Sequence, residues 1–186
     1  MSSEQDAGTT VEPDTPPLPP RRGLLLVLVA LVVVTADIIT KIIVVATLEG
    51  ERPVRVLGGL AYLQLVRNPG AAFSMATGMT WVLSLIALAV AGAIVWILPR
   101  LRSAGWAVGL GLVLAGALGN LSDRIFRAPG PLRGHVIDFV SVFAPNAEKF
   151  PVFNVADSAI TIGGALIVLM ALLGRDYDGR STRAAT

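Results

Sequence analysis

The chain has 186 residues, of which 54% are hydrophobic, and its mean hydropathy of +0.71 exceeds what a soluble core requires, so part of the apolar surface is expected to face lipid. The formal charge of +2 comes from arginines beside apolar runs and not from a basic face interleaved with aromatics, so nucleic acid is not an expected partner. With no cysteine, the chain can have no disulfide, thiolate nucleophile or cysteine-ligated metal.

Residues 1–20 combine acidic residues with a run of prolines, a composition that predicts a disordered tail. Arg21 and Arg22 then precede an apolar stretch over 23–48, which at about 1.5 Å per residue exceeds the roughly 30 Å hydrocarbon layer. The stretch is long and has no convincing small-residue cleavage site. It therefore predicts a spanning helix and not a cleaved signal peptide.

Three further apolar stretches cover 79–98, 104–121 and 155–173, each close to the roughly 20 residues that a spanning helix needs. The sequence therefore predicts four spanning helices in a membrane domain over 21–175, followed by a tail over 176–186.

Two longer segments, 49–78 and 122–154, are expected to lie outside the bilayer on the same side, because two spans separate them. In the first, β-branched and aromatic residues over 54–57 and 60–66 flank Gly58 and Gly59, a pattern typical of a small hairpin.

Basic residues give a balanced count for the two sides, seven on each, so their density decides the predicted orientation. Two of the five linker residues 99–103 are arginine, and Arg21 and Arg22 directly precede the first helix. Positive charge next to spans favours the cytoplasmic side. Both termini are therefore predicted to be cytoplasmic, and 49–78 and 122–154 extracytoplasmic.

The unusual polar residues all fall where this topology brings four helix ends to one face. Charged side chains in or beside the hydrocarbon layer are costly and persist where they pair, line a wet cavity or do chemistry. One shared site is therefore expected from Asp37, Lys41, Asn68, Asn120, Asp123, Arg124, Asp138, Asn154 and Asp157.

Asp123 and Asp157 are the predicted catalytic pair, because one ends the third span and the other begins the fourth. Two close carboxylates do not both ionise easily, so one keeps a proton while the other activates a water, as in aspartyl proteases. The alternative is structural: Asp123 pairs with Arg124, and Asp157 caps the last helix.

Asp37 and Lys41 lie four positions apart on one helix face, which indicates an ion pair with a structural or substrate-positioning role.

Asn68, Pro69 and Gly70 indicate a turn that lets the backbone approach another group closely. His135 has no second histidine for zinc, and no Gly-x-Ser-x-Gly elbow is present, so neither a metal nor a cofactor is expected.

Two other functions remain open: a small proton-coupled membrane transporter component, and a structural or assembly partner without activity. A relay would spread polar residues through the membrane depth, whereas Asp123 and Asp157 cluster at one end. An inactive partner would leave this clustering unexplained.

Five sequence blocks in order resemble the bacterial lipoprotein signal peptidases, also called signal peptidase II. They are Asp37 with Lys41; Asn68 with Gly70, Ala71, Ala72 and Phe73; the run 116–124 ending in Asn120-Leu121-Ser122-Asp123-Arg124; Val136-Ile137-Asp138-Phe139; and Phe153-Asn154-Val155-Ala156-Asp157-Ser158. The resemblance implies that Asp123 and Asp157 are catalytic. It implies supporting or substrate-binding roles for Asn68, Gly70, Asn120, Arg124, Asn154, Ala156, Asp37 and Lys41.

The resemblance also implies a substrate and a setting. The substrate would be a prolipoprotein bearing diacylglycerol on its cysteine and cut before that cysteine, with lipid around the enzyme. The expected enzyme is a monomer of the bacterial inner membrane with its site near the extracytoplasmic face. A small extracytoplasmic sheet and a short helix around 140–150 would complete this otherwise all-α fold.

Overall fold

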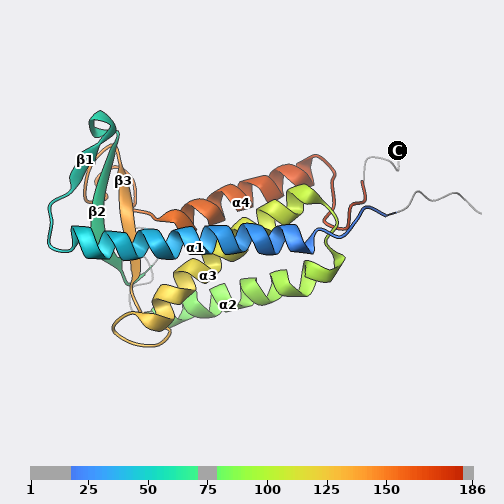
Figure 1. Cartoon of the computed structure of the whole chain (residues 1–186), viewed down its shortest axis with the longest axis horizontal. Coiled ribbons are helices and arrows are strands. Elements are labelled where there is room, and N and C mark those ends of the chain that lie inside the picture. The colour runs from blue at the N-terminus through green and yellow to red at the C-terminus, as the bar shows by residue number, and fades with distance from the viewer. Residues whose placement is uncertain (1–17, 71–78, 182–186) are drawn as a thin grey trace, which may run out of the picture.

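The computed structural model describes residues 18–70 and 79–181 and contains four long helices in this part of the chain (Figure 1). They are α1 (Gly23–Leu48), α2 (Thr80–Ile97), α3 (Ala104–Phe126) and α4 (Val155–Leu172). Each is long and apolar enough to cross a membrane. The predicted helical membrane fold is confirmed. The expected disorder before residue 18, the segment 71–73 and the chain after residue 181 lie outside the described residues.

Helix α3 is the centre of the bundle and packs against each of the other three helices. Its span is 56% buried, against 11–22% for the spans of the others, whose remaining apolar surface faces outward. Small residues make this close packing possible. A Cβ on Gly109 would meet the carbonyl oxygen of Gly163 in α4 at 3.2 Å, and one on Gly111 would meet Leu26 of α1.

A three-stranded antiparallel sheet covers one end of the bundle, and α1 begins and α4 ends at the opposite end (Figure 1). The hairpin predicted around Gly58 and Gly59 is confirmed: β1 (Val54–Val56) pairs with β2 (Ala61–Asn68) through a turn in which Gly58 has φ 67°. The third strand, β3 (Val136–Val142), pairs with β2 and brings Asp138 opposite Val66.

The expectation of a short helix around 140–150 is wrong. Strand β3 occupies the residues up to Val142, and turns and bends follow until α4. Phe143, Asn146 and Ala147 all have positive φ, a left-handed backbone that a right-handed helix cannot contain.

Helix α3 continues past the end of its apolar run, because its polar last turns find partners inside the protein. The apolar stretch ends near residue 121, but the helix runs to Phe126. Asp123 and Arg124 are both buried in it. Asp123 is therefore a side chain within the helix and not a residue beyond its end.

Substitution of Gly163 by leucine is expected to destabilise the bundle, because a Cβ there would meet the carbonyl oxygen of Gly109 at 2.6 Å and backbone cannot easily move away. Overpacking of this kind costs about 1–3 kcal/mol or more. Thermal unfolding in detergent should show a lower Tm for Gly163→Leu. The neighbouring Gly164→Leu is the control, since nothing lies within 4 Å of its Cβ position. Equal Tm values for the two variants would contradict this packing.

Candidate active site

A cavity of about 620 Å³ lies between the sheet and the bundle and contains most of the predicted site residues. Its polar wall is formed by Asn68, Gly70, Asn120, Arg124, Asp138 and Asp157. Its other wall is largely apolar and includes Leu83 of α2, Ile160 and Ile162 of α4, and Phe150 and Phe153 from the loop before α4. Ile160 and Ile162 are 39% and 60% exposed.

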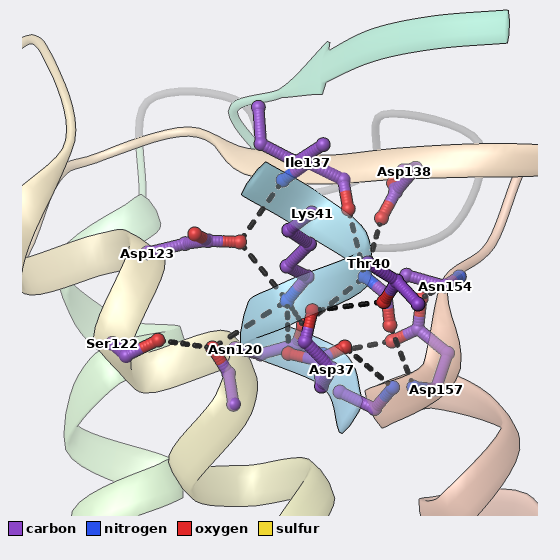
Figure 2. A network of polar contacts seen from close by, with 12 residues as sticks. Asp37, Thr40, Lys41, Asn120, Ser122, Asp123, Ile137, Asp138, Asn154 and Asp157 are labelled. Atoms are coloured by element: carbon purple, nitrogen blue, oxygen red, sulfur yellow. Dashed lines mark hydrogen bonds and ion pairs between the residues drawn. The ribbon is translucent and has the colours of Figure 1, made fainter. Parts of the chain in front are cut away.

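Two carboxylates, Asp138 from β3 and Asp157 from the first turn of α4, line this cavity together. Asn154 connects them (Figure 2). Its Nδ2 donates to Asp138 Oδ1 at 2.8 Å, and its backbone N–H donates to Asp157 Oδ2 at 3.2 Å. Asn154 and Asp157 also form a capping box on α4, so the predicted capping role of Asp157 is present. Asp138 is 2% exposed, whereas Asp157 is half-buried.

The other oxygens of the two carboxylates also accept hydrogen bonds from amides. Asn68 Nδ2 donates to Asp138 Oδ2 at 2.8 Å, and Asn120 Nδ2 donates to Asp157 Oδ1 at 2.8 Å. Three asparagines therefore hold the pair in place without neutralising its charge.

Arg124 brings positive charge to the cavity from α3. It is 7% exposed, and its Nη2 donates to the carbonyl oxygen of Gly70 at 3.0 Å. Its Nη1 is buried without a hydrogen-bond partner among the described residues. This nitrogen is free to donate to a group that enters the cavity.

Asp123 does not line the cavity. Its Oδ2 lies 2.9 Å from Lys41 Nζ and accepts a hydrogen bond from Ile137 N at 3.1 Å, and its Oδ1 pairs with Arg127. In Figure 2 the carboxylate lies on one side of Lys41, with Asp138 and Asp157 on the other. The cation expected as its structural partner, Arg124, binds Gly70 instead.

Asp37 and Lys41 form the ion pair that their spacing predicts, with 2.7 Å between Oδ2 and Nζ. Both are at most 1% exposed. Asp37 Oδ1 accepts a hydrogen bond from Ala156 N at 2.9 Å, which ties α1 to the first turn of α4. Ala156 contributes this backbone group from a fully buried position.

Asp138 has a proton affinity unlike that of an ordinary aspartate. Burial, followed by the nearby Asp157 carboxylate, raises the pKa of Asp138 from 3.8 to about 7. Hydrogen bonds from Asn68 and Asn154 and the charge of Lys41 act in the opposite direction but are outweighed. Near neutral pH this carboxyl group is therefore poised to hold or release a proton.

Asp138 was expected in the shared site, and the structure places it beside Asp157 in the cavity. The signal was its place inside the run Val136–Val142, a strand in which every neighbour is apolar apart from Ser141. An acidic residue in such a run is buried at a cost, which is typical of functional sites. Within residues 18–70 and 79–181, no group of three or more potential ligands could hold a metal ion.

Comparisons with known proteins agree with this architecture. The family model described as Signal peptidase (SPase) II matches residues 29–173. The lipoprotein signal peptidase of Mycobacterium tuberculosis (strain ATCC 25618 / H37Rv) is 51% identical over 185 residues, which is 100% of this chain and 89% of that protein. The lipoprotein signal peptidase of Rhodococcus jostii (strain RHA1) is 56% identical over 163 residues, or 88% and 80% of the two chains.

Two solved structures, both described as bacterial membrane enzymes, share the fold. One has a TM-score of 0.70 at 29% identity and covers 84% of this chain and 93% of its own. The other has a TM-score of 0.67 at 32% identity and covers 80% and 92%.

The raised pKa of Asp138 predicts how stability depends on pH. A carboxyl group that binds its proton more tightly in the folded state stabilises the fold fully below pH 3.8, and this contribution is lost as pH rises through about 7. Asp138→Asn removes the carboxyl group and with it this pH-dependent contribution to stability. We therefore expect the Tm of Asp138→Asn minus that of the parent to increase by roughly 5 °C between pH 5 and pH 8. The exposed Glu148→Gln should show no such change. A pH-independent difference for Asp138→Asn would contradict the pKa.

Proposed function

The chain belongs to the signal peptidase II family of aspartic peptidases, and from this membership we propose that Asp138 and Asp157 are the carboxylates with which it cuts its substrate. The carrying observation is that these two side chains line one cavity and are bridged by Asn154. The pair replaces the Asp123–Asp157 pair expected from the sequence.

The activity of the chain is that of a lipoprotein signal peptidase, a membrane enzyme that acts on prolipoproteins. Peptide hydrolysis by two carboxylates needs one ionised and one protonated group. Asp138, with a pKa of about 7, holds the proton in the resting enzyme. Asp157, which accepts hydrogen bonds at both oxygens, acts as the base.

The two groups then act in concert on the scissile peptide. Asp157 takes a proton from a water molecule as the water oxygen attacks the carbonyl carbon, and Asp138 donates its proton to the carbonyl oxygen. When the tetrahedral intermediate collapses, the C–N bond breaks and the leaving nitrogen takes up the proton that Asp157 accepted. One hydroxyl of the intermediate returns its proton to Asp138 as the C=O bond of the new carboxylic acid forms. Arg124 Nη1 is available for a substrate carbonyl during these steps.

Asp123 has a supporting role in this proposal. Between Lys41 and Arg127 its charge is already neutralised by two cations, and its backbone partner Ile137 directly precedes Asp138. Both of its oxygens are therefore engaged, and it does not line the cavity. Its contribution is to fix α3 against β3.

The apolar wall of the cavity supports a lipid-modified substrate. Ile160 and Ile162 both line the cavity and face outward from α4, so an acyl chain can follow them from the bilayer to the carboxylates. The scissile bond would then precede a diacylglyceryl cysteine whose lipid remains in the membrane. We place the sheet outside the cytoplasm and both termini inside, as the arginine density favours, and we take the working enzyme to be a monomer.

Asp138→Asn and Asp157→Asn are each expected to lower the rate of cleavage of a purified lipidated prolipoprotein by about a thousandfold or more, because each leaves the pair without its acid or its base. Release of signal peptide, followed by gel shift, measures the rate. Asp123→Asn should lower Tm but keep measurable turnover per folded enzyme.

The exposed Glu148→Gln serves as the matched control, since it removes one negative charge at the same end of the protein. If a folded Asp138→Asn enzyme still processes substrate and a folded Asp123→Asn enzyme does not, the result would favour the Asp123–Asp157 pair expected from the sequence.

The proposed role of protonated Asp138 also predicts how kcat/KM falls at alkaline pH. Because its pKa is about 7 and the mechanism needs the protonated form, kcat/KM should fall about tenfold for each pH unit above this value. Initial rates between pH 5 and pH 9 in one mixed buffer test this. A rate that stays constant up to pH 9 would exclude Asp138 as the acid.

A further inference from the structure

The asparagines that donate to the carboxylate pair are themselves oriented through their oxygens. Asn68 Oδ1 accepts from Gly70 N at 2.9 Å, and Asn154 Oδ1 accepts from Asp157 N at 2.8 Å. A backbone N–H cannot accept a hydrogen bond, so neither carboxamide can turn over without setting two donors against each other. Each NH₂ group therefore stays directed at Asp138.

Asn120 is oriented in the same way, but by a side chain. Its Oδ1 accepts from Lys41 Nζ at 3.1 Å while its Nδ2 donates to Asp157 Oδ1 at 2.8 Å (Figure 2). An ammonium group has donors only. Reversal of the Asn120 amide would therefore face NH₂ toward the ammonium and oxygen toward the carboxylate, two repulsive contacts.

We propose that Lys41 is a positioning residue of the peptidase, whose ammonium group fixes the Asn120 carboxamide so that it donates to Asp157 and holds this carboxylate aimed at the cavity. The inference rests on the proposed Asp138–Asp157 pair. Lys41 is 1% exposed and does not line the cavity, so it acts through Asn120 and not on the substrate.

The charge of Lys41 is already neutralised, which points to hydrogen-bond geometry as the means of action. Its Nζ lies 2.7 Å from Asp37 and 2.9 Å from Asp123, and Asp123 also pairs with Arg127. Two cations and two carboxylates leave no net charge. Of the charged groups near the pair, Arg124 of α3 lines the cavity with it, whereas Asp37 and Lys41 of α1 and Asp123 and Arg127 of α3 belong to the cluster beside the cavity.

Asn154 is a second donor to Asn120 but has other acceptors to satisfy. Its Nδ2 donates to Asn120 Oδ1 at 3.2 Å, and its two protons are shared among this oxygen, Asp138 Oδ1 at 2.8 Å and the carbonyl oxygen of Ile137 at 3.2 Å. Of the described donors to Asn120 Oδ1, the ammonium group is therefore the one not required elsewhere by the pair.

The test is Asp37→Asn with Lys41→Met, a double change that leaves the net charge of the cluster as in the parent. It is compared with the parent, and Asp37→Asn alone is the control for the loss of the Asp37 carboxylate. Asparagine at 37 can still accept from Ala156 N, and Asp123 keeps Arg127. Loss of an oriented donor to a charged group is expected to lower kcat about tenfold or more, with KM within about twofold. The acid limb of the kcat/KM profile should move to higher pH, because the ionised form of the pair has lost a donor.

A double-mutant cycle separates positioning from general destabilisation. In an Asn120→Ala background the Lys41 change should have little further effect on kcat, because the contact through which it acts is already gone. If the fold-losses in kcat caused by the Lys41 change and by Asn120→Ala multiply in the combined variant, the two residues act independently and the proposal is overturned. A folded double variant with kcat within twofold of the parent would also overturn it.

Two controls keep the result interpretable. If the methionine variant is not recovered folded, Asp37→Asn with Lys41→Leu gives the same cycle, since leucine also has no donor for Asn120 Oδ1. Asp138→Asn in the same assay tests the pair itself. If it remains active, the proposed function fails; if it is inactive while the Lys41 and Asn120 losses multiply, only the positioning role fails.

Discussion

The buried ion cluster around Lys41 is the constraint on which the site depends. Asp37, Lys41 and Asp123 are all less than 5% exposed, and through their backbone partners they join α1 and α3 to the start of α4 and to β3. An unpaired charge at this depth would cost several kcal/mol. The helices therefore cannot shift past one another without breaking a pair, and the positions of all groups beside the cavity follow from that restriction.

Two aspartates a short distance apart along the chain have different surroundings. Asp123 lies between two cations, Lys41 and Arg127. Asp138 receives hydrogen bonds from neutral amides and faces Asp157, so burial dominates and its pKa rises to about 7. The residue type is the same, and Asp138 is the one that lines the cavity.

The position of the cavity fits the lipid-modified substrate that we propose. It lies where the sheet meets the bundle, with amides and carboxylates on one wall and the side chains of α2 and α4 on the other. Helix α3, the most buried of the four, carries Asn120 and Arg124 to this level. A peptide bond and an acyl chain can therefore be held at once, each by the wall that matches it.

The sequence by itself determined the four helices, the hairpin around Gly58 and Gly59, and the end of the bundle at which the polar residues gather, because hydropathy and turn residues act locally along the chain. It did not determine which carboxylate faces Asp157, nor the irregular path after Val142. The placement of Asp138, and not Asp123, beside Asp157 depends on the rotation of α3, which turns Asp123 toward Lys41, and on the pairing of β3 with β2, which carries Asp138 to the cavity. Both are set by packing between segments distant in the chain, so only the tertiary structure decided them.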